Sequence, residues 1–321
     1  MRKSLLGQVR IACKEVTKKA RYVRVNSKLI PSYVASLSPE ELRLRTVDPR
    51  DAYLGHKDDL IAYVLTLDSI NFGSGYFPHL RLTTNTSGYF TIASALKNRF
   101  NTKGPLTPQE LLNLEPHDCA EIFQQDLQDD NRRELMRLFT SALNDLGGFI
   151  LDRFGGKFSN LITQANSSVE NLVKILVEMP YFRDVAQYKH LTVPFYKRAQ
   201  ITAADLSLRF NGEGPGFFVD LEHLTIFADN RVPHVLRVDG ILSYEDSLAA
   251  KIAAGKLIPS GSAEEVEIRA SALHAVELIV AHLRNLGREI ISMDVDLYLW
   301  NRGHSDRYKS VPRHLTRTVY Y

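Results

Sequence analysis

An aspartate and an arginine stand two residues apart between apolar neighbours in the segment 227–234 (FADNRVPH). Burying either charge alone costs several kcal/mol, so a packed protein keeps such a cluster only if it is paired or used. One interpretation is chemical, with Asp229 as a catalytic carboxylate and Arg231 beside it. The other is structural, with Asp229 capping or bracing the helix that Pro233 interrupts and Arg231 as its surface partner. The motif by itself leaves both open.

A polar and aromatic cluster closes a predicted helix at 68–78 (DSINFGSGYFP). Asn71 can donate and accept hydrogen bonds, and Phe72 offers a flat face of the kind on which a heteroaromatic base stacks. The alternative is a helix C-terminus with packed aromatic residues. The pattern favours neither.

Two further segments contain residue types that bind nucleotides. Lys197 lies where a helix is expected to begin, and a cation at a helix N-terminus suits a single phosphate, although surface cations are common. Phe218 and Asp220 follow the glycine-rich loop 211–216, where an aromatic ring and a carboxylate could read a guanine-like base. The alternative places Phe218 in the core and makes Asp220 a helix cap.

The only tryptophan, Trp300, ends an alternation of acids and apolar residues at 293–300 (MDVDLYLW). It either walls a ligand pocket or packs in the core, as a lone tryptophan more often does. Glu265, Glu267 and Arg269 fall near the start of a predicted helix, where acids favour the helix dipole.

Helical signals dominate the elements that must position these residues. Ser38, Thr107 and Ser262 each precede an acid at capping-box spacing, which predicts three helix starts, the last running until Gly287. Extended structure is expected only in short segments, at 22–25 and 80–83. We therefore predict a mostly α, multi-helix globular fold with few short strands. The remaining segments with helical periodicity are 58–67, 89–100, 132–154, 168–179 and 199–210.

The composition is that of an ordinary globular protein, with 44% hydrophobic and 24% charged residues in 321. We expect a single domain over 1–321, formed either as one body or as two tightly packed helical lobes. The net charge of +3 is too small to indicate stable binding of long nucleic acid, while a small anionic substrate remains compatible. No stretch is apolar enough for a membrane span, so no membrane partner is expected.

The cysteine and histidine patterns predict neither a disulfide framework nor a metal site. Cys13 and Cys119 lie far apart, and the ten histidines form no recognised ligand spacing. A reducing cytoplasm fits best, and no metal or other cofactor is expected. Neither pattern indicates an oligomeric state.

Five separated motifs resemble the queuosine salvage protein family, whose members are queuosine 5′-monophosphate N-glycosylases: LDSINFGSGYFP, FYKRAQITAADL, FADNRVPHVL, EEVEIRA and DVDLYLW. That family is similar to the helical helix-hairpin-helix DNA glycosylases. The resemblance implies hydrolysis of the bond between base and ribose, which releases queuine. The implied substrate is the free nucleotide, with the nucleoside as the alternative.

The resemblance also implies residue roles. Asp229 would be the catalytic carboxylate. Asn71, Phe72, Phe218 and Asp220 would surround the base, and Lys197 would approach the 5′-phosphate. Arg231 and Trp300 are further candidates for substrate binding from their own motifs. Asn230, Gly73 and Gly75 depart from the eukaryotic members, which have a tyrosine and bulkier residues there, so nearby base contacts can differ.

The implied reaction has a physical basis. Cleavage of a ribosyl bond develops positive charge on the sugar, which a fixed carboxylate stabilises more than it stabilises the neutral ground state. Asp229 could instead activate water or attack the anomeric carbon. Queuine is a 7-deazaguanine without an N7 to protonate, so leaving-group help must come from other hydrogen bonds. Asp205 or Asp296 could meet the cationic amine of its cyclopentenediol arm.

Two other functions remain open from the sequence. A module that binds a modified nucleotide without chemistry would release no base. A glycosylase acting on intact nucleic acid would show salt-dependent affinity for tRNA or duplex DNA.

Overall fold

A computed structural model describes residues 4–83 and 86–321. This part of the chain contains fifteen α-helices and two small antiparallel sheets of two strands each, which confirms the mostly α prediction. The chain divides into two compact units, each assembled from separate stretches of sequence. The first unit comprises Met1–Arg45, Asp184–Lys197 and Glu222–Arg317; the second comprises Thr46–Arg183, Arg198–Leu221 and Thr318–Tyr321.

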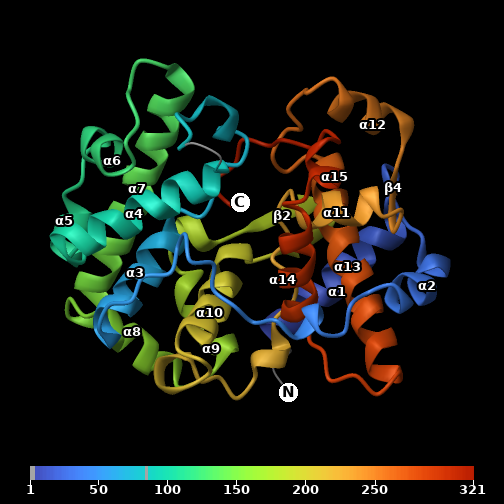
Figure 1. Ribbon diagram of the computed structural model, residues 1–321, viewed down its shortest axis with the longest axis horizontal. Helices are drawn as coiled ribbons and strands as arrows, with labels where there is room; N and C mark the ends of the chain where they lie inside the picture. Colours follow the sequence, from blue (N-terminus) through green and yellow to red (C-terminus); the bar gives the residue numbers. More distant parts are fainter. Residues whose placement is uncertain (1–3, 84–85) are drawn as a thin grey trace. The chain divides into compact units, whose positions relative to one another are not determined.

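The first unit is built around one long helix, α13, against which α1, α2, α11 and α14 pack (Figure 1). Its side chains are buried on all sides for most of its length, so it forms the core of this unit. The helices of the unit are α1 (Leu5–Lys19), α2 (Ile30–Ala35), α11 (Val232–Val238), α12 (Asp246–Ala253), α13 (Ala263–Asn285), α14 (Ser292–Arg302) and α15 (Asp306–Lys309).

Helix α13 begins where the sequence predicts, because the hydroxyl of Ser262 accepts a hydrogen bond from the Glu265 amide at 3.3 Å. It ends just before Gly287, whose φ of 75° suits glycine. Its buried Glu267 accepts hydrogen bonds from three backbone N–H groups of residues 21–23 and from the Tyr188 hydroxyl at 2.7 Å. These donors offset the cost of burying the carboxylate.

Both sheets belong to the first unit. Strand β1 (Val23–Val25) pairs with β4 (Leu242–Tyr244), and β2 (Val185–Tyr188) forms a hairpin with β3 (Leu191–Pro194). The extended structure expected at 22–25 is confirmed as strand β1, whereas at 80–83 Leu80 is extended but no paired strand forms. There the Gln125 side chain bonds both the N–H and the C=O of Arg81, at 2.9 and 3.2 Å, so these two backbone groups are satisfied without a neighbouring strand.

The longest helix of the second unit is the 25-residue α7, against which α3, α5, α6 and α8 pack. The predicted helices in this unit are confirmed, with Thr107 completing a capping box at the start of α5. Its helices are α3 (Lys57–Ser69), α4 (Gly88–Lys103), α5 (Pro108–Leu112), α6 (Pro116–Ile122), α7 (Asp130–Phe154), α8 (Phe158–Ala165), α9 (Val169–Leu176) and α10 (Lys197–Arg209), of which only Lys197 is assigned to the first unit.

The helix start predicted at Ser38 is wrong. The Ser38 hydroxyl does accept a hydrogen bond from the Glu41 amide at 3.2 Å, but only a 3₁₀ turn, Glu41–Arg43, follows. Leu44 adopts an extended conformation and ends it. A cap lowers the cost of starting a helix, but a helix also needs an apolar face to bury, and only Leu42 is buried in this turn.

A buried arginine ties α10 into the second unit. Arg198 is 1% exposed, and its guanidinium donates to backbone carbonyls at the end of α3, in the 3₁₀ turn at 180–182 and at Val319. The same group lies over the rings of Phe72 and Phe182, at 4.8 and 4.9 Å. Arg198 therefore links the end of α3 to two segments that are remote along the chain.

Across residues 4–83 and 86–321 no helix is both long and apolar enough to cross a membrane. The single-domain prediction stays a prediction.

Candidate active site

Asp229 lies in the first unit, on the loop 227–231 that leads into α11, and its side chain is half-buried. Its Oδ1 accepts hydrogen bonds from the amides of Arg231 at 2.7 Å and Val232 at 3.1 Å. Asp229 therefore does cap α11, as the structural interpretation of the motif expects. Its Oδ2 has no hydrogen-bond partner among the described residues, so one oxygen can serve a ligand while the other holds the helix.

The loop is held from both sides immediately before Asp229. The amide of Phe227 donates to Asp296 Oδ1 on α14 at 2.8 Å. The carbonyl of Ala228 accepts from Arg269 Nε on α13 at 2.8 Å. Two helices thus fix the peptide groups that precede the carboxylate.

Two more contacts hold the loop after Asp229. The Asn230 side chain donates to the His314 carbonyl at 3.4 Å, and the Arg231 guanidinium lies over the Trp300 ring at 5.0 Å. Arg231 is buried and is not the surface partner that the structural interpretation assumed. Because the backbone on either side is fixed, the Asp229 carboxylate is preorganised, the condition for electrostatic stabilisation of developing charge.

A buried ion pair supports the same region. Both terminal guanidinium nitrogens of Arg269, Nη1 and Nη2, donate to the Asp184 carboxylate, at 3.0 and 2.5 Å, and Arg269 also lies over the Phe195 ring at 3.9 Å. Asp184 Oδ2 in turn accepts from the backbone N–H of Lys197 at 3.2 Å. Lys197 is only 4% exposed, so this bond fixes a largely enclosed cation at the start of α10.

Asp296 is the second acid of the site, 3% exposed. Burial, reinforced by the negative charge of Asp229, raises the pKa of Asp296 to about 8, against the lowering effect of the Phe227 amide and of Lys197. At neutral pH Asp296 is therefore mostly protonated.

Three basic side chains, Arg313, His234 and His314, have pKa values that burial lowers. Burial lowers the pKa of Arg313, and the negative charge of Asp229 opposes that lowering. Burial lowers the pKa of His314 to about 3 and also lowers that of His234, whose Nε2 contacts the Tyr308 carbonyl at 2.8 Å. Both histidines are neutral at neutral pH.

The base-binding residues predicted in the second unit are largely enclosed. Phe72 is buried, stacked on Tyr181 with ring centroids 6.1 Å apart and edge-on to Phe139 at 5.1 Å. Asn71 is half-buried directly after α3. Phe72 therefore has the packing that the alternative of a C-terminus with packed aromatics expects, and its base contact stays a prediction.

Asp220 serves as the cap of α9 in the second unit. Its carboxylate accepts from the Ser168 hydroxyl at 2.8 Å and from the amides of Val169 and Glu170 at 2.6 and 3.2 Å. The helix-cap alternative thus describes the observed contacts. A role for Asp220 in base recognition stays a prediction.

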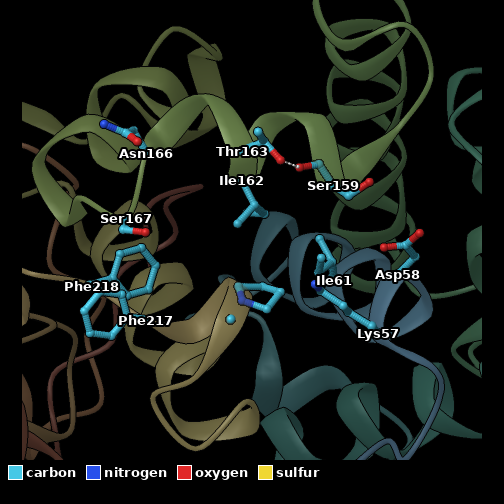
Figure 2. Close-up of a pocket in the computed structure, with 12 residues that line it drawn as sticks. Lys57, Asp58, Ile61, Ser159, Ile162, Thr163, Asn166, Ser167, Phe217 and Phe218 are labelled. Carbon is cyan, nitrogen blue, oxygen red and sulfur yellow. Dashed lines mark hydrogen bonds between the residues drawn. The ribbon is translucent and has the colours of Figure 1, made fainter.

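Phe218 borders a surface hollow of about 360 Å³ in the second unit (Figure 2). Figure 2 shows its ring beside that of Phe217 on one side of the hollow and Ile61 and Lys57 on the other. Phe218 is buried, whereas Phe217 is 50% exposed. Phe218 therefore has little free surface to offer a base, and its base contact stays a prediction.

The first unit therefore contains Asp229, Lys197, Arg231 and Trp300, and the second contains the remaining predicted residues. Sequence reasoning named Asp296 only as one of two candidates to meet an amine; the other, Asp205, forms an ion pair with Arg209 at 3.7 Å on α10.

Sequence reasoning missed Asp184 and Arg313. Each is a single charged residue with no local pattern around it, so no sequence signal marked it. Within the described ranges no group of three histidine, cysteine or acidic side chains is placed to hold a metal ion.

Fold and site define a mostly helical protein with a preorganised carboxylate, a second, neutral acid and enclosed cations, suited to stabilising positive charge on a bound anionic ligand. The chain matches the family model described as queuosine salvage protein over residues 52–321. It is 37% identical to a Sphaerobacter thermophilus protein over 83% of this chain and 82% of that protein, and 31% identical to one from Mus musculus over 91% and 90%. Both relatives are named queuosine 5′-phosphate N-glycosylase/hydrolase. The chain belongs to the queuosine salvage protein family.

Proposed function

We propose that this protein is an N-glycosidase that hydrolyses queuosine 5′-monophosphate. One water is consumed, the bond between C1′ and the base breaks, and queuine and ribose 5-phosphate are released. Membership in a family whose curated relatives carry this activity in their names supports the reaction. The observation that carries the catalytic assignment is Asp229, a carboxylate with one oxygen bound to two amides and the other without a partner among the described residues.

The role proposed for Asp229 is electrostatic. As the glycosidic bond lengthens, positive charge develops on the ribose, and a carboxylate that is already fixed stabilises it without reorganising. The contacts of Phe227, Ala228, Asn230 and Arg231 supply that fixation. Lys197 and Arg231 are the proposed cationic contacts of the nucleotide, and Trp300 supports Arg231.

Recognition of the base is assigned from the resemblance. Asn71, Phe72, Phe218 and Asp220 are the proposed contacts, and hydrogen bonds to the base edge must assist departure because a 7-deazaguanine has no N7 to protonate. We also propose that the substrate is the free nucleotide and that the reaction occurs in the cytoplasm, which the buried, unpaired thiols of Cys13 and Cys119 support.

The deciding experiment incubates the protein with queuosine 5′-monophosphate and measures free queuine by mass spectrometry. Asp229→Asn isolates the effect of the charge, because the amide oxygen can still accept hydrogen bonds from the Arg231 and Val232 amides while the negative charge is lost. We expect kcat to fall by roughly 10² to 10³-fold. Asp246→Asn, an exposed acid of α12 in the same unit, is the matched control and should retain full activity.

The outcomes separate the functions. Binding of the nucleotide by wild type without any release of queuine would identify a binding module and refute the enzyme. Release of queuine at the wild-type rate by Asp229→Asn would refute the catalytic role of this carboxylate.

A further inference from the structure

Asp296 is the acid that shares the Asp229 loop, and its contacts differ from those of other buried acids in the first unit. Asp184 forms an ion pair with Arg269, and Asp294 forms one with Arg45 at 2.7 Å. Glu267 accepts hydrogen bonds from three backbone amides and one hydroxyl. Asp296 accepts one hydrogen bond, from the Phe227 amide, and forms no ion pair with any described residue. A buried acid with so little compensation is stable only when it is neutral.

The charges around Asp296 reinforce that state. The negative charge of Asp229 on the loop and the positive charge of Lys197 at the start of α10 both act on Asp296. Arg313, in the C-terminal segment, interacts electrostatically with Asp229. Of the two acids, Asp229 has two amide donors and partial exposure, while Asp296 has one donor and is enclosed. The proton of the pair therefore belongs on Asp296.

We propose that Asp296 is a positioning residue: as a neutral acid it holds the Phe227 peptide, and so the loop, while the single negative charge of the pair stays on Asp229. This assignment rests on the proposed function. It replaces the idea that Asp296 meets the cationic amine of the substrate, because a neutral acid offers that amine no charge. It also gives the α14 motif a defined task in the site.

The contact between Asp296 and the Phe227 amide predicts different kcat values for two variants of Asp296. Asp296→Asn keeps an oxygen that can accept from Phe227 and is neutral at every pH, so kcat at pH 7 should stay within about threefold of wild type. Asp296→Ala loses the acceptor, and kcat should fall about tenfold or more, with KM changed less. If the carboxylate were needed in its charged form, Asp296→Asn would instead lose at least as much activity as Asp296→Ala, because both variants lack the charge.

The pH dependence of kcat tests whether Asp296 carries a proton. In wild type, kcat should decline above about pH 8 as Asp296 ionises beside Asp229. In Asp296→Asn that decline should disappear. A decline caused by loss of the proton of Lys197 would persist in the variant, which separates the two groups.

A direct measurement makes the test independent of activity. Carbon-13 NMR of protein labelled at the aspartate carboxyl carbons should show one resonance titrating near pH 8, absent in Asp296→Asn. In Asp229→Asn, which keeps the loop contacts, this resonance should titrate at lower pH because the neighbouring negative charge is gone.

Two results overturn the proposal: Asp296→Asn as inactive as Asp229→Asn, or all aspartate carboxyl groups of wild type titrating in the ordinary range. The second can be read even if Asp296→Asn fails to fold. If wild type releases no queuine but the titration near pH 8 is present and responds to Asp229→Asn, the proposed function fails while the coupled pair stands.

Discussion

Asp296 links the site to stability, because a buried acid with a raised pKa makes folding depend on pH. Unfolded, an aspartate has a pKa of about 3.9; folded, Asp296 has a pKa of about 8. Between these values the folded state binds more protons than the unfolded state, so the contribution of Asp296 to stability falls as pH rises from about 4 to 8. The enclosed acid is retained at a cost in stability, as functional sites often are.

Asp296→Asn should therefore stabilise the protein increasingly with pH. At about 1.4 kcal/mol per pH unit, its advantage over wild type should be on the order of 3 kcal/mol greater at pH 7 than at pH 4.5. Urea unfolding at both pH values measures the difference. Parallel stability curves for variant and wild type would contradict the protonation assigned to Asp296.

Helix α9 shows how one side chain can serve an element and a proposed site. Asp220 lies outside α9, yet it accepts two amide hydrogen bonds at the helix N-terminus and one from Ser168, itself the N-cap residue. This arrangement satisfies N–H groups that have no partner within the helix.

Asp220→Ala should lower the free energy of unfolding by about 1 kcal/mol through loss of this cap. Asp220→Asn keeps an acceptor and should lose less. Denaturant unfolding measures the cap, and kcat/KM for queuosine 5′-monophosphate measures base recognition. A large fall in kcat/KM for Asp220→Asn without loss of stability would support the base contact, whereas unchanged kcat/KM would leave Asp220 with the cap alone.

At the scale of the whole molecule, charge limits the partners. Basic residues number 40 and acidic residues 37, so the chain lacks the surplus that holds proteins on long nucleic acid. The free nucleotide is accordingly the proposed substrate.

Intact tRNA containing queuosine should yield no queuine with this protein, whereas the same tRNA digested to 5′-monophosphates should yield it. Mass spectrometry of both reactions at low and moderate salt checks this. Excess unmodified tRNA should leave hydrolysis of the free nucleotide unchanged. Release from intact tRNA, suppressed by salt, would instead indicate a nucleic-acid glycosylase.

Local features were predictable and distant pairings were not. The caps at Thr107 and Ser262 are formed as their spacing predicts, because capping involves residues within one turn. The cap at Ser38 forms without a helix, because helix growth depends on a face to bury. The short strands β2, β3 and β4 were missed because three or four residues contain little periodicity.

The sequence by itself determined the helical class, the family and the candidate carboxylate at Asp229. Tertiary structure alone decided which charged groups interact. Arg269 forms an ion pair with Asp184, 85 residues away, whereas Asp296 accepts a single hydrogen bond, from the Phe227 amide. The physical reason is that the charge state of an acid depends on burial and on nearby charges. Folding brings these together from segments that are remote along the chain.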